Sequence, residues 1–469
     1  MAMPAFRAGP DSEPALRAAI ERTMPGVRAD LERLIRIPGI AFDGFDHSHV
    51  EQSAAAVADL ALSCGLRTRV VRSGGQPAVI GRREAPPGSP TVLLYAHHDV
   101  QPAGDLTRWA SDPFEPVERD GRLYGRGAAD DKAGVMTHIA ALRALGDDIG
   151  VGVVLFVEGE EEYGSASLDR LITEHVGAPH PDVIVVADSD NWDIGRPALT
   201  TSLRGLVSCF AEVRTARGAV GGPAPDALTV LAHLLSSLHD DEGAVAVDGL
   251  AGRENTTLDY PEDRFRREAG VLAGVRLIGV GRIADRLWNR PSIAVLGIDA
   301  PSTGAAPNAA APAARAKISV RLAPGDDPAS AYAALRAHLE KHVPWGAHLS
   351  VTLESGGAPC VLDTTGPAYD AARAACTVAW DGTAPVEVGI GGSIPCVATF
   401  QQRFPAAAIL VTGIEDPYCA AHGPDESLHL AEFTRTCLAE TLLLRDLAEL
   451  PNSRPSPATL PGRSCREDE

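Results

Sequence analysis

The sequence predicts an α/β fold, in which a mainly parallel sheet carries helices on both faces and a small α+β domain is inserted into the chain. Continuous runs of Val, Ile and Leu are typical of parallel strands, because both faces of such strands are buried. Four such runs occupy residues 92–95, 151–157, 183–186 and 406–411. Strands and helices also alternate up to about residue 203, as the crossover connections of a parallel sheet require.

Two helices are predicted before the first of these strands. The first covers residues 14–37, where Pro14 marks the start and apolar residues such as Leu16 and Ile20 recur at helical spacing. The second covers residues 50–64 and ends at a glycine.

After Gly205 the pattern changes to that of a small α+β unit. Strands are predicted at residues 206–214, 293–298, 316–322 and 349–353, and helices from Pro225 and over residues 327–342. Two helices among four strands predict an inserted lid domain at residues 206–356. The sheet domain then comprises residues 1–205 and 357–450, and ends with a helix over 427–450. Residues 451–469 are rich in Pro, Ser and Arg, which predicts a disordered tail.

Composition excludes several classes of function. The formal net charge of -20 argues against a nucleic-acid partner and against binding to an anionic membrane. No apolar stretch of about 18 residues is present, and the first ten residues do not resemble a signal peptide. The eight cysteines form no CxxC pair, so we expect free thiols, a cytoplasmic location and no structural zinc held by cysteine.

Hard metal ligands follow the predicted strands, and open α/β sheets bind ligands at the carboxyl ends of their strands. His97 follows the 92–95 run by two residues. Asp99 projects to the same side, where a carboxylate can fix an imidazole that binds a metal. A glycine-rich segment, residues 123–132, leads into Asp130 and Asp131 at the start of a predicted helix. Helix capping is the alternative role for Asp130, but two carboxylates beside a ligating histidine favour a metal site.

Three adjacent glutamates, residues 160–162, follow the 151–157 run. They would repel one another unless cations neutralise them, the alternative being a solvated loop. We therefore expect one glutamate to bind a metal and a neighbour to act as general base. Asp188 and Asp190 share one side of their loop, and one of them is expected to be a ligand. His422 is a single histidine in a loop.

Together these motifs resemble the di-zinc exopeptidases and aminoacylases, a family that includes carnosine dipeptidase, cytosolic nonspecific dipeptidase, acetylornithine deacetylase and succinyl-diaminopimelate desuccinylase. The similar stretches are residues 95–102, 109–116, 123–132, 158–165, 189–191, 391–395 and 421–423. The resemblance covers about residues 14–450, and the dipeptidase branch fits best. It implies a zinc exopeptidase-like fold and two divalent metal ions, zinc by expectation, with manganese or cobalt as alternatives.

Carried over by position, the resemblance implies that His97 and Asp190 bind one ion and that Glu162 and His422 bind the other. Asp130 would bridge the two ions, and a cis peptide would join it to the next residue. Two further roles are implied, for Asp99 as the residue that orients His97 and for Glu161 as the general base. The implied reaction is hydrolysis of the amide bond of a dipeptide or similar small peptide by a water that bridges the ions.

The resemblance also implies how substrate is held. Arg321 matches an arginine of the lid that binds a substrate carboxylate, although a surface role is the alternative. Gly392 and Ser393 match a loop that faces the substrate. The family also implies a homodimer formed through the lid domain.

One departure concerns the lid. Dipeptidase relatives carry there a histidine that reaches the partner subunit's site, whereas this chain has Ala216. Arg217 is one possible replacement, and His233 or His239 on the following helix is another. The alternatives to a dipeptidase are therefore an N-acyl amino-acid deacylase with the same metal centre, or a metal-binding homologue with weakened activity.

Overall fold

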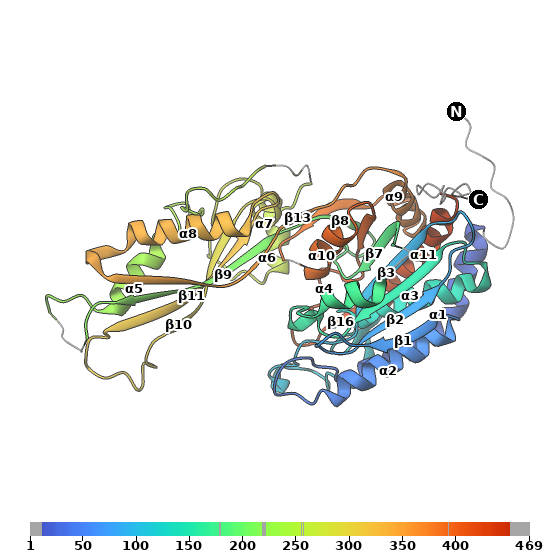
Figure 1. The fold of residues 1–469 in the computed structure, drawn as a ribbon, viewed down its shortest axis with the longest axis horizontal. Coiled ribbons are helices and arrows are strands. Elements are labelled where there is room, and N and C mark those ends of the chain that lie inside the picture. The colour runs from blue at the N-terminus through green and yellow to red at the C-terminus, as the bar shows by residue number, and fades with distance from the viewer. Residues whose placement is uncertain are drawn as a thin grey trace, which may run out of the picture.

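The computed structural model describes residues 12–177, 180–217, 222–254, 256, 258–392 and 394–450. It has two lobes, a larger one built on a nine-stranded sheet and an elongated one built on a four-stranded sheet (Figure 1). The predicted tail at 451–469 lies outside the described residues.

The large sheet has the strand order β1-β2-β6-β3-β7-β15-β8-β13, and β14 also pairs with β8. The four predicted apolar runs form its centre, where β6 (Gly152–Glu158), β3 (Thr91–His97), β7 (Val183–Ala187) and β15 (Ala408–Thr412) are adjacent and parallel. The outer strands are β1 (Arg67–Val71), β2 (Ala78–Arg83), β8 (Ala198–Leu203), β13 (Cys360–Val361) and β14 (Val386–Ile390). Most outer pairs are antiparallel, and the fold class predicted from the sequence is confirmed.

Helices cover both faces of this sheet. Residues of β3 alternate between two cores, since Leu94 belongs to one and Leu93 to the other. The first core contains α1 (Glu13–Ile35), α2 (Ser48–Ser63), α3 (Lys132–Leu145), α9 (Pro367–Ala379) and α11 (Leu430–Ala448). The second contains α4 (Leu168–Leu171) and α10 (Pro395–Arg403). Because both faces are covered, the site must lie at an end of the strands.

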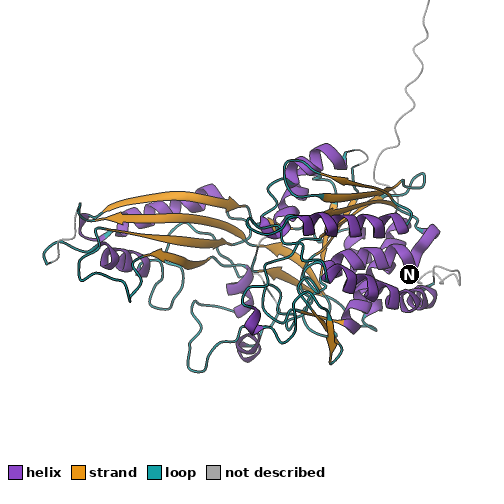
Figure 2. Cartoon of the chain, turned by 90° about the horizontal axis from the view of Figure 1, so that it is seen from below, coloured by secondary structure: helices purple, strands orange, loops and turns teal. Residues whose placement is uncertain are grey.

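The small lobe is an antiparallel sheet with the order β10-β11-β9-β12. Its strands are β9 (Gly205–Arg214), β10 (Ser292–Asp299), β11 (Ala313–Leu322) and β12 (His348–Gly357). The strands run lengthwise along the lobe (Figure 2), and α5 (Ala227–Ser236) and α8 (Pro328–His342) share a hydrophobic core with them. This is the additional α+β unit that the sequence predicts.

Part of the range predicted as lid packs on the large lobe instead. Helix α7 (Ile283–Trp288) buries Ala284 and Trp288 against Trp192 and Val388, and α6 (Glu262–Glu268) lies on the same segment. The domain boundaries at 205/206 and 356/357 therefore stay a prediction.

A third, three-stranded sheet joins β16 (Ser427–His429), β5 (Arg122–Tyr124) and β4 (Val117–Arg119). It brings the glycine-rich segment beside the loop that contains His422. Among the described residues, no helix is both long and apolar enough to cross a bilayer. The seven described cysteines are all free thiols, as expected.

Candidate metal centre

The central parallel strands all deliver their carboxyl ends to one region. Strand β3 ends at His97, β6 ends at Glu158, β7 ends just before Asp188, and β15 leads into the loop that carries His422. The loops after these strands therefore bring together side chains that are far apart in the sequence.

Asp130 lies between the two histidines that the sequence singles out. Its Oδ1 lies 3.1 Å from Nε2 of His97, and its Oδ2 lies 2.8 Å from Nε2 of His422. Glu162 adds a second carboxylate, with Oε2 3.1 Å from the same His422 nitrogen. Burial would raise the pKa of the Asp130 carboxyl, but its hydrogen bonds with His422 and His97 hold that pKa well below its ordinary value. Asp130 and Glu162 raise the pKa of His422 to about 10.

Glu426 holds the backbone that presents Asp130. Its carboxylate accepts the N–H groups of Gly127, Ala129 and Asp130 at 3.0–3.1 Å, and the guanidinium of Arg126 at 2.7 Å. Gly127 has a φ of +79°, and a Cβ there would lie 2.7 Å from a Val100 methyl carbon, so the turn requires glycine. The peptide between Asp130 and Asp131 is cis, as expected. Sequence reasoning missed Glu426, whose only signal is an acidic residue just before the buried β16.

Lys132 fixes the other end of the same turn. Its buried Nζ donates to the carbonyl oxygens of Leu34 at 2.8 Å and Ile37 at 2.7 Å, at the end of α1. The turn is thus tied both to the His422 loop and to a helix of the core.

Asp99 contacts both His97 and the glutamate turn. Its Oδ1 lies 3.4 Å from Nδ1 of His97, which also hydrogen bonds to the Asp99 backbone carbonyl at 3.1 Å. The same carboxylate accepts the backbone N–H groups of Glu161 and Glu162, both at 3.1 Å. Asp99 therefore lies against the His97 ring, and its role in orienting that ring stays a prediction.

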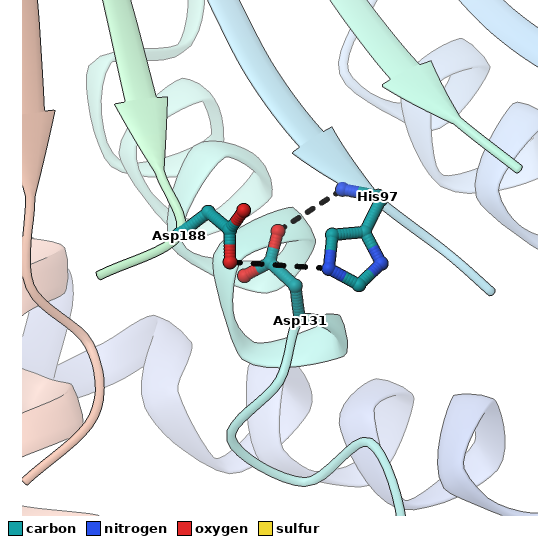
Figure 3. Close-up of side chains that lie close together, drawn as sticks. All are labelled: His97, Asp131 and Asp188. Atoms are coloured by element: carbon teal, nitrogen blue, oxygen red, sulfur yellow. Dashed lines mark hydrogen bonds and ion pairs between the residues drawn. The ribbon is translucent and has the colours of Figure 1, made fainter. Parts of the chain in front are cut away.

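Two further carboxylates approach His97 (Figure 3). Oδ2 of Asp131 accepts the backbone N–H of His97 at 3.0 Å, and Oδ1 of Asp188 lies 3.9 Å from its Nε2. Burial and neighbouring charges, Asp130 among them, raise the pKa of Asp188 to about 7. Asp131 was not assigned a role from the sequence, although it directly follows the predicted bridging residue.

Asp190 lies elsewhere on the rim of the cluster. It is exposed, and its carboxylate groups with Glu415 and the Cys419 thiol within 4.8 Å. Glu415 in turn groups with Asp130 and Asp188 within the same distance. The structure therefore places Asp188, not Asp190, beside His97, and the role of Asp190 as a ligand stays a prediction. Glu415 was missed because nothing in its sequence context distinguishes it.

Glu161 opens the short turn η3 (Glu161–Tyr163) at the edge of the cluster. Desolvation raises the pKa of its carboxyl well above the ordinary range, and the charges of Asp188 and Asp99 add to the rise.

The predicted substrate residues lie where the two lobes meet. Arg321 is half-buried on β11 and has no carboxylate partner among the described residues. Arg204 lies near it, and donates its backbone N–H to the Gly392 carbonyl at 3.1 Å and its side-chain Nε to the Gly391 carbonyl at 3.1 Å. Ser393 lies outside the described residues.

The residues considered at the lid lie on or beside elements of the small lobe. Ala216 and Arg217 are exposed just beyond the end of β9. His233 on α5 packs against Trp345, with ring centroids 5.1 Å apart, and His239 forms a bridge with Val245. Whether Arg217, His233 or His239 takes the role that the resemblance gives to a lid histidine stays a prediction.

The side chains of the cluster suit divalent metal ions. Asp130, Glu162 and His422 present ligand atoms within 4.8 Å of one another, and His97, Asp131 and Asp188 form a second such group. Imidazole and carboxylate ligands without thiolate are typical of hydrolytic zinc and manganese sites. Cations would also relieve the repulsion among carboxylates buried at this depth.

Comparisons with known proteins relate this chain to a family of peptidases. A family model described as peptidase family M20/M25/M40 matches residues 93–445. The chain is 36% identical over 379 residues to a cysteinylglycine-S-conjugate dipeptidase of Corynebacterium striatum, covering 78% of this chain and 83% of that protein. It is 30% identical to a β-Ala-His dipeptidase of Rattus norvegicus, covering 74% and 77%. The solved structure of the dipeptidase Dug1p from Saccharomyces cerevisiae matches with a TM-score of 0.81 at 24% identity, covering 95% and 100%.

Proposed function

Since the chain belongs to peptidase family M20/M25/M40, we propose that it is a metal-dependent dipeptidase. The observation that carries the proposal is the position of Asp130, whose two oxygens face His97 and His422 while Glu161 opens the adjacent turn. The names of similar proteins support dipeptides as the substrate class, including S-conjugates of cysteinylglycine and β-Ala-His.

Two divalent ions would be held by the cluster. His97 and Asp130 would bind the first, together with Asp190 as the resemblance implies or Asp188 as its distance to His97 favours. Asp130, Glu162 and His422 would bind the second. We propose zinc, with manganese or cobalt as alternatives. When bound, such ions lower the pKa of a water and polarise the amide carbonyl.

Different residues of the chain then carry out the proton transfers and the binding of the substrate. Glu161 accepts a proton from the attacking water, and the oxygen of that water bonds to the carbonyl carbon. The amide C–N bond then breaks as Glu161 returns the proton to the leaving amine. Asp99 keeps His97 in place. Arg321 binds the carboxylate of the substrate. The backbone of Gly392 contacts the substrate, together with Ser393.

We also propose a homodimer formed through the lid. Strand β10 is an edge strand of the small sheet, and Val295, Leu296 and Ile298 on it are 42%, 60% and 51% exposed. Exposed apolar edge strands are the usual places for pairing with a second chain. The free thiols of the seven cysteines that the structure describes also suit a reducing cytoplasm.

The test is hydrolysis of a panel of dipeptides and N-acetyl amino acids by purified protein loaded with zinc or manganese. Cleavage of dipeptides supports the proposal, and cleavage of acetylated amino acids alone assigns a deacylase. Two bound metals without cleavage of any amide would identify a metal-binding homologue that has lost activity.

A further inference from the structure

A cavity of about 250 Å³ opens beside the metal centre, between the large lobe and the α6–α7 segment. Asp190 lies at its lining, and Gly391 of the loop held by Arg204 lies there also. The roles considered so far use only Asp190 and the loop of Gly391 from this lining, and most of the lining comes from residues that no sequence motif singled out.

The walls of the cavity are mainly aromatic and aliphatic. Trp192 and Trp288 are each 8% exposed, and the Trp192 ring lies 5.0 Å from that of Tyr260 and 6.3 Å from that of Trp288 between centroids. Aliphatic groups complete the lining, namely Leu287, Val388 and Ile390. A Cβ at Gly389 would lie 2.6 Å from Cβ of Trp288, so glycine is what lets this tryptophan pack over β14.

The two charged side chains of α6 that reach the cavity neutralise each other. Nε of Arg264 lies 2.6 Å from Oε1 of Glu268, which also accepts a hydrogen bond from the Tyr260 hydroxyl through its other oxygen. The guanidinium of Arg264 stacks on the Trp192 ring at 4.2 Å. Because these two charges are paired, the part of the cavity between the aromatic rings, away from Asp190, favours an uncharged, apolar occupant.

The position of the cavity identifies what that occupant is. Asp190 groups with Glu415, and Glu415 groups with Asp130, so the cavity begins at the edge of the residues that would hold the reacting amide. The amino-terminal residue carries its side chain on the carbon that is bonded directly to the reacting carbonyl, so that side chain can enter the cavity. An engineered cavity of about 150 Å³ holds benzene, so this one has room for a substituted ring or a branched chain.

We propose that this cavity binds the apolar side chain of the amino-terminal residue of the dipeptide, and so selects substrates with a bulky apolar group there. The inference rests on the proposed dipeptidase function. It assigns specificity to Trp192, Tyr260, Leu287 and Trp288, which are positioned by the sheet lobe and by the inserted segment together.

The kinetic test compares Ala-Gly, Phe-Gly, S-benzylcysteinylglycine and Gly-Phe with the full-length metal-loaded protein. We expect kcat/KM to be at least roughly tenfold higher for the second and third than for the first, and no such gain for Gly-Phe. Leu287→Trp fills the cavity and should bring the ratio of Phe-Gly to Ala-Gly towards one. Leu272→Trp is the matched control, since Leu272 is 76% exposed outside the cavity, and should keep the ratio.

Equal rates for all amino-terminal residues, a preference for Gly-Phe, or a ratio unchanged in Leu287→Trp would each overturn the proposal. A binding measurement separates this result from failure of the dipeptidase assignment. S-benzylcysteine should shift the tryptophan fluorescence, and Trp288→Phe should weaken that response. If no dipeptide is cleaved but this response is found, only the dipeptidase assignment fails; absence of the response overturns the cavity proposal.

Discussion

Oδ2 of Asp130 lies 2.8 Å from Nε2 of His422, although 292 residues separate them in the chain. The contact exists because Glu426, four residues after His422, binds the backbone of the turn that carries Asp130. The same carboxylate thus fixes both loops, and the geometry between the two candidate ligands depends on it.

Asp130→Ala should lower the metal content of the purified protein. Asp130 is the residue that faces both candidate ion positions, so its loss should remove more than one ligand bond. Elemental analysis after dialysis measures the metal per chain, and circular dichroism checks that the fold is kept. Asp105→Ala, at an exposed position, is the control. A variant that retains two ions would contradict the bridging role.

Glu161→Gln should leave the metal content unchanged and lower kcat by roughly 10² to 10⁴, the usual contribution of a general base. The amide keeps the size of the side chain but cannot take a proton from water. Dipeptide turnover and metal analysis on one preparation make the measurement. Substantial residual activity would remove Glu161 from this role.

Asp188→Asn should change how stability depends on pH in the metal-free protein. Burial raises the pKa of Asp188 from 3.8 to about 7, so the folded protein retains this proton where the unfolded chain has lost it. Stability from this group is complete below about pH 4 and is lost as the pH rises to about 7. We therefore expect the variant to have the higher Tm in chelator at pH 8, and the difference to vanish near pH 4.

Asp59→Asn, on the exposed face of α2, controls for the change in net charge in that experiment. A difference in Tm that does not vary with pH would contradict the assigned cause. Zinc should also raise the Tm of each variant above its value in chelator. If this rise is smaller for Asp188→Asn than for Asp190→Asn, Asp188 is the ligand, and the reverse result identifies Asp190.

The sequence predicts the centre of the fold well because both faces of the central strands are buried. Long Val-rich runs indicate such strands, and the four predicted runs correspond to β3, β6, β7 and β15. The short strands β8, β13 and β14 were not predicted, since partly exposed segments of two to six residues carry little pattern.

The sequence predicts the candidate site less completely than the fold, for a different physical reason. Asp188 and Asp190 are two residues apart and would face the same side of an extended segment. Only the path of the loop after β7 decides which of them approaches His97. Glu415 and Glu426 act through contacts with segments almost 300 residues away, which no local pattern records.

The lid offers a last prediction, which concerns Ala216. Strand β9 has ten residues at about 3.3 Å each, so its end at Arg214 lies about 30 Å from the point where β9 leaves the large lobe, and Ala216 is two residues further along the chain. A side chain there can reach a metal centre only in a second copy of the chain. Ala216→His should then raise kcat, by up to roughly 10² if it donates to the developing oxyanion.

The gain should require the dimer. Leu296→Glu places a charge on the exposed edge strand β10 and should give monomers in size-exclusion chromatography with light scattering. In the double variant, Ala216→His should therefore raise kcat no further, whereas Leu272→Glu, exposed outside the lid sheet, should preserve both the dimer and the gain. A gain that persists in monomers would show that the histidine acts within its own subunit, against the distance along β9.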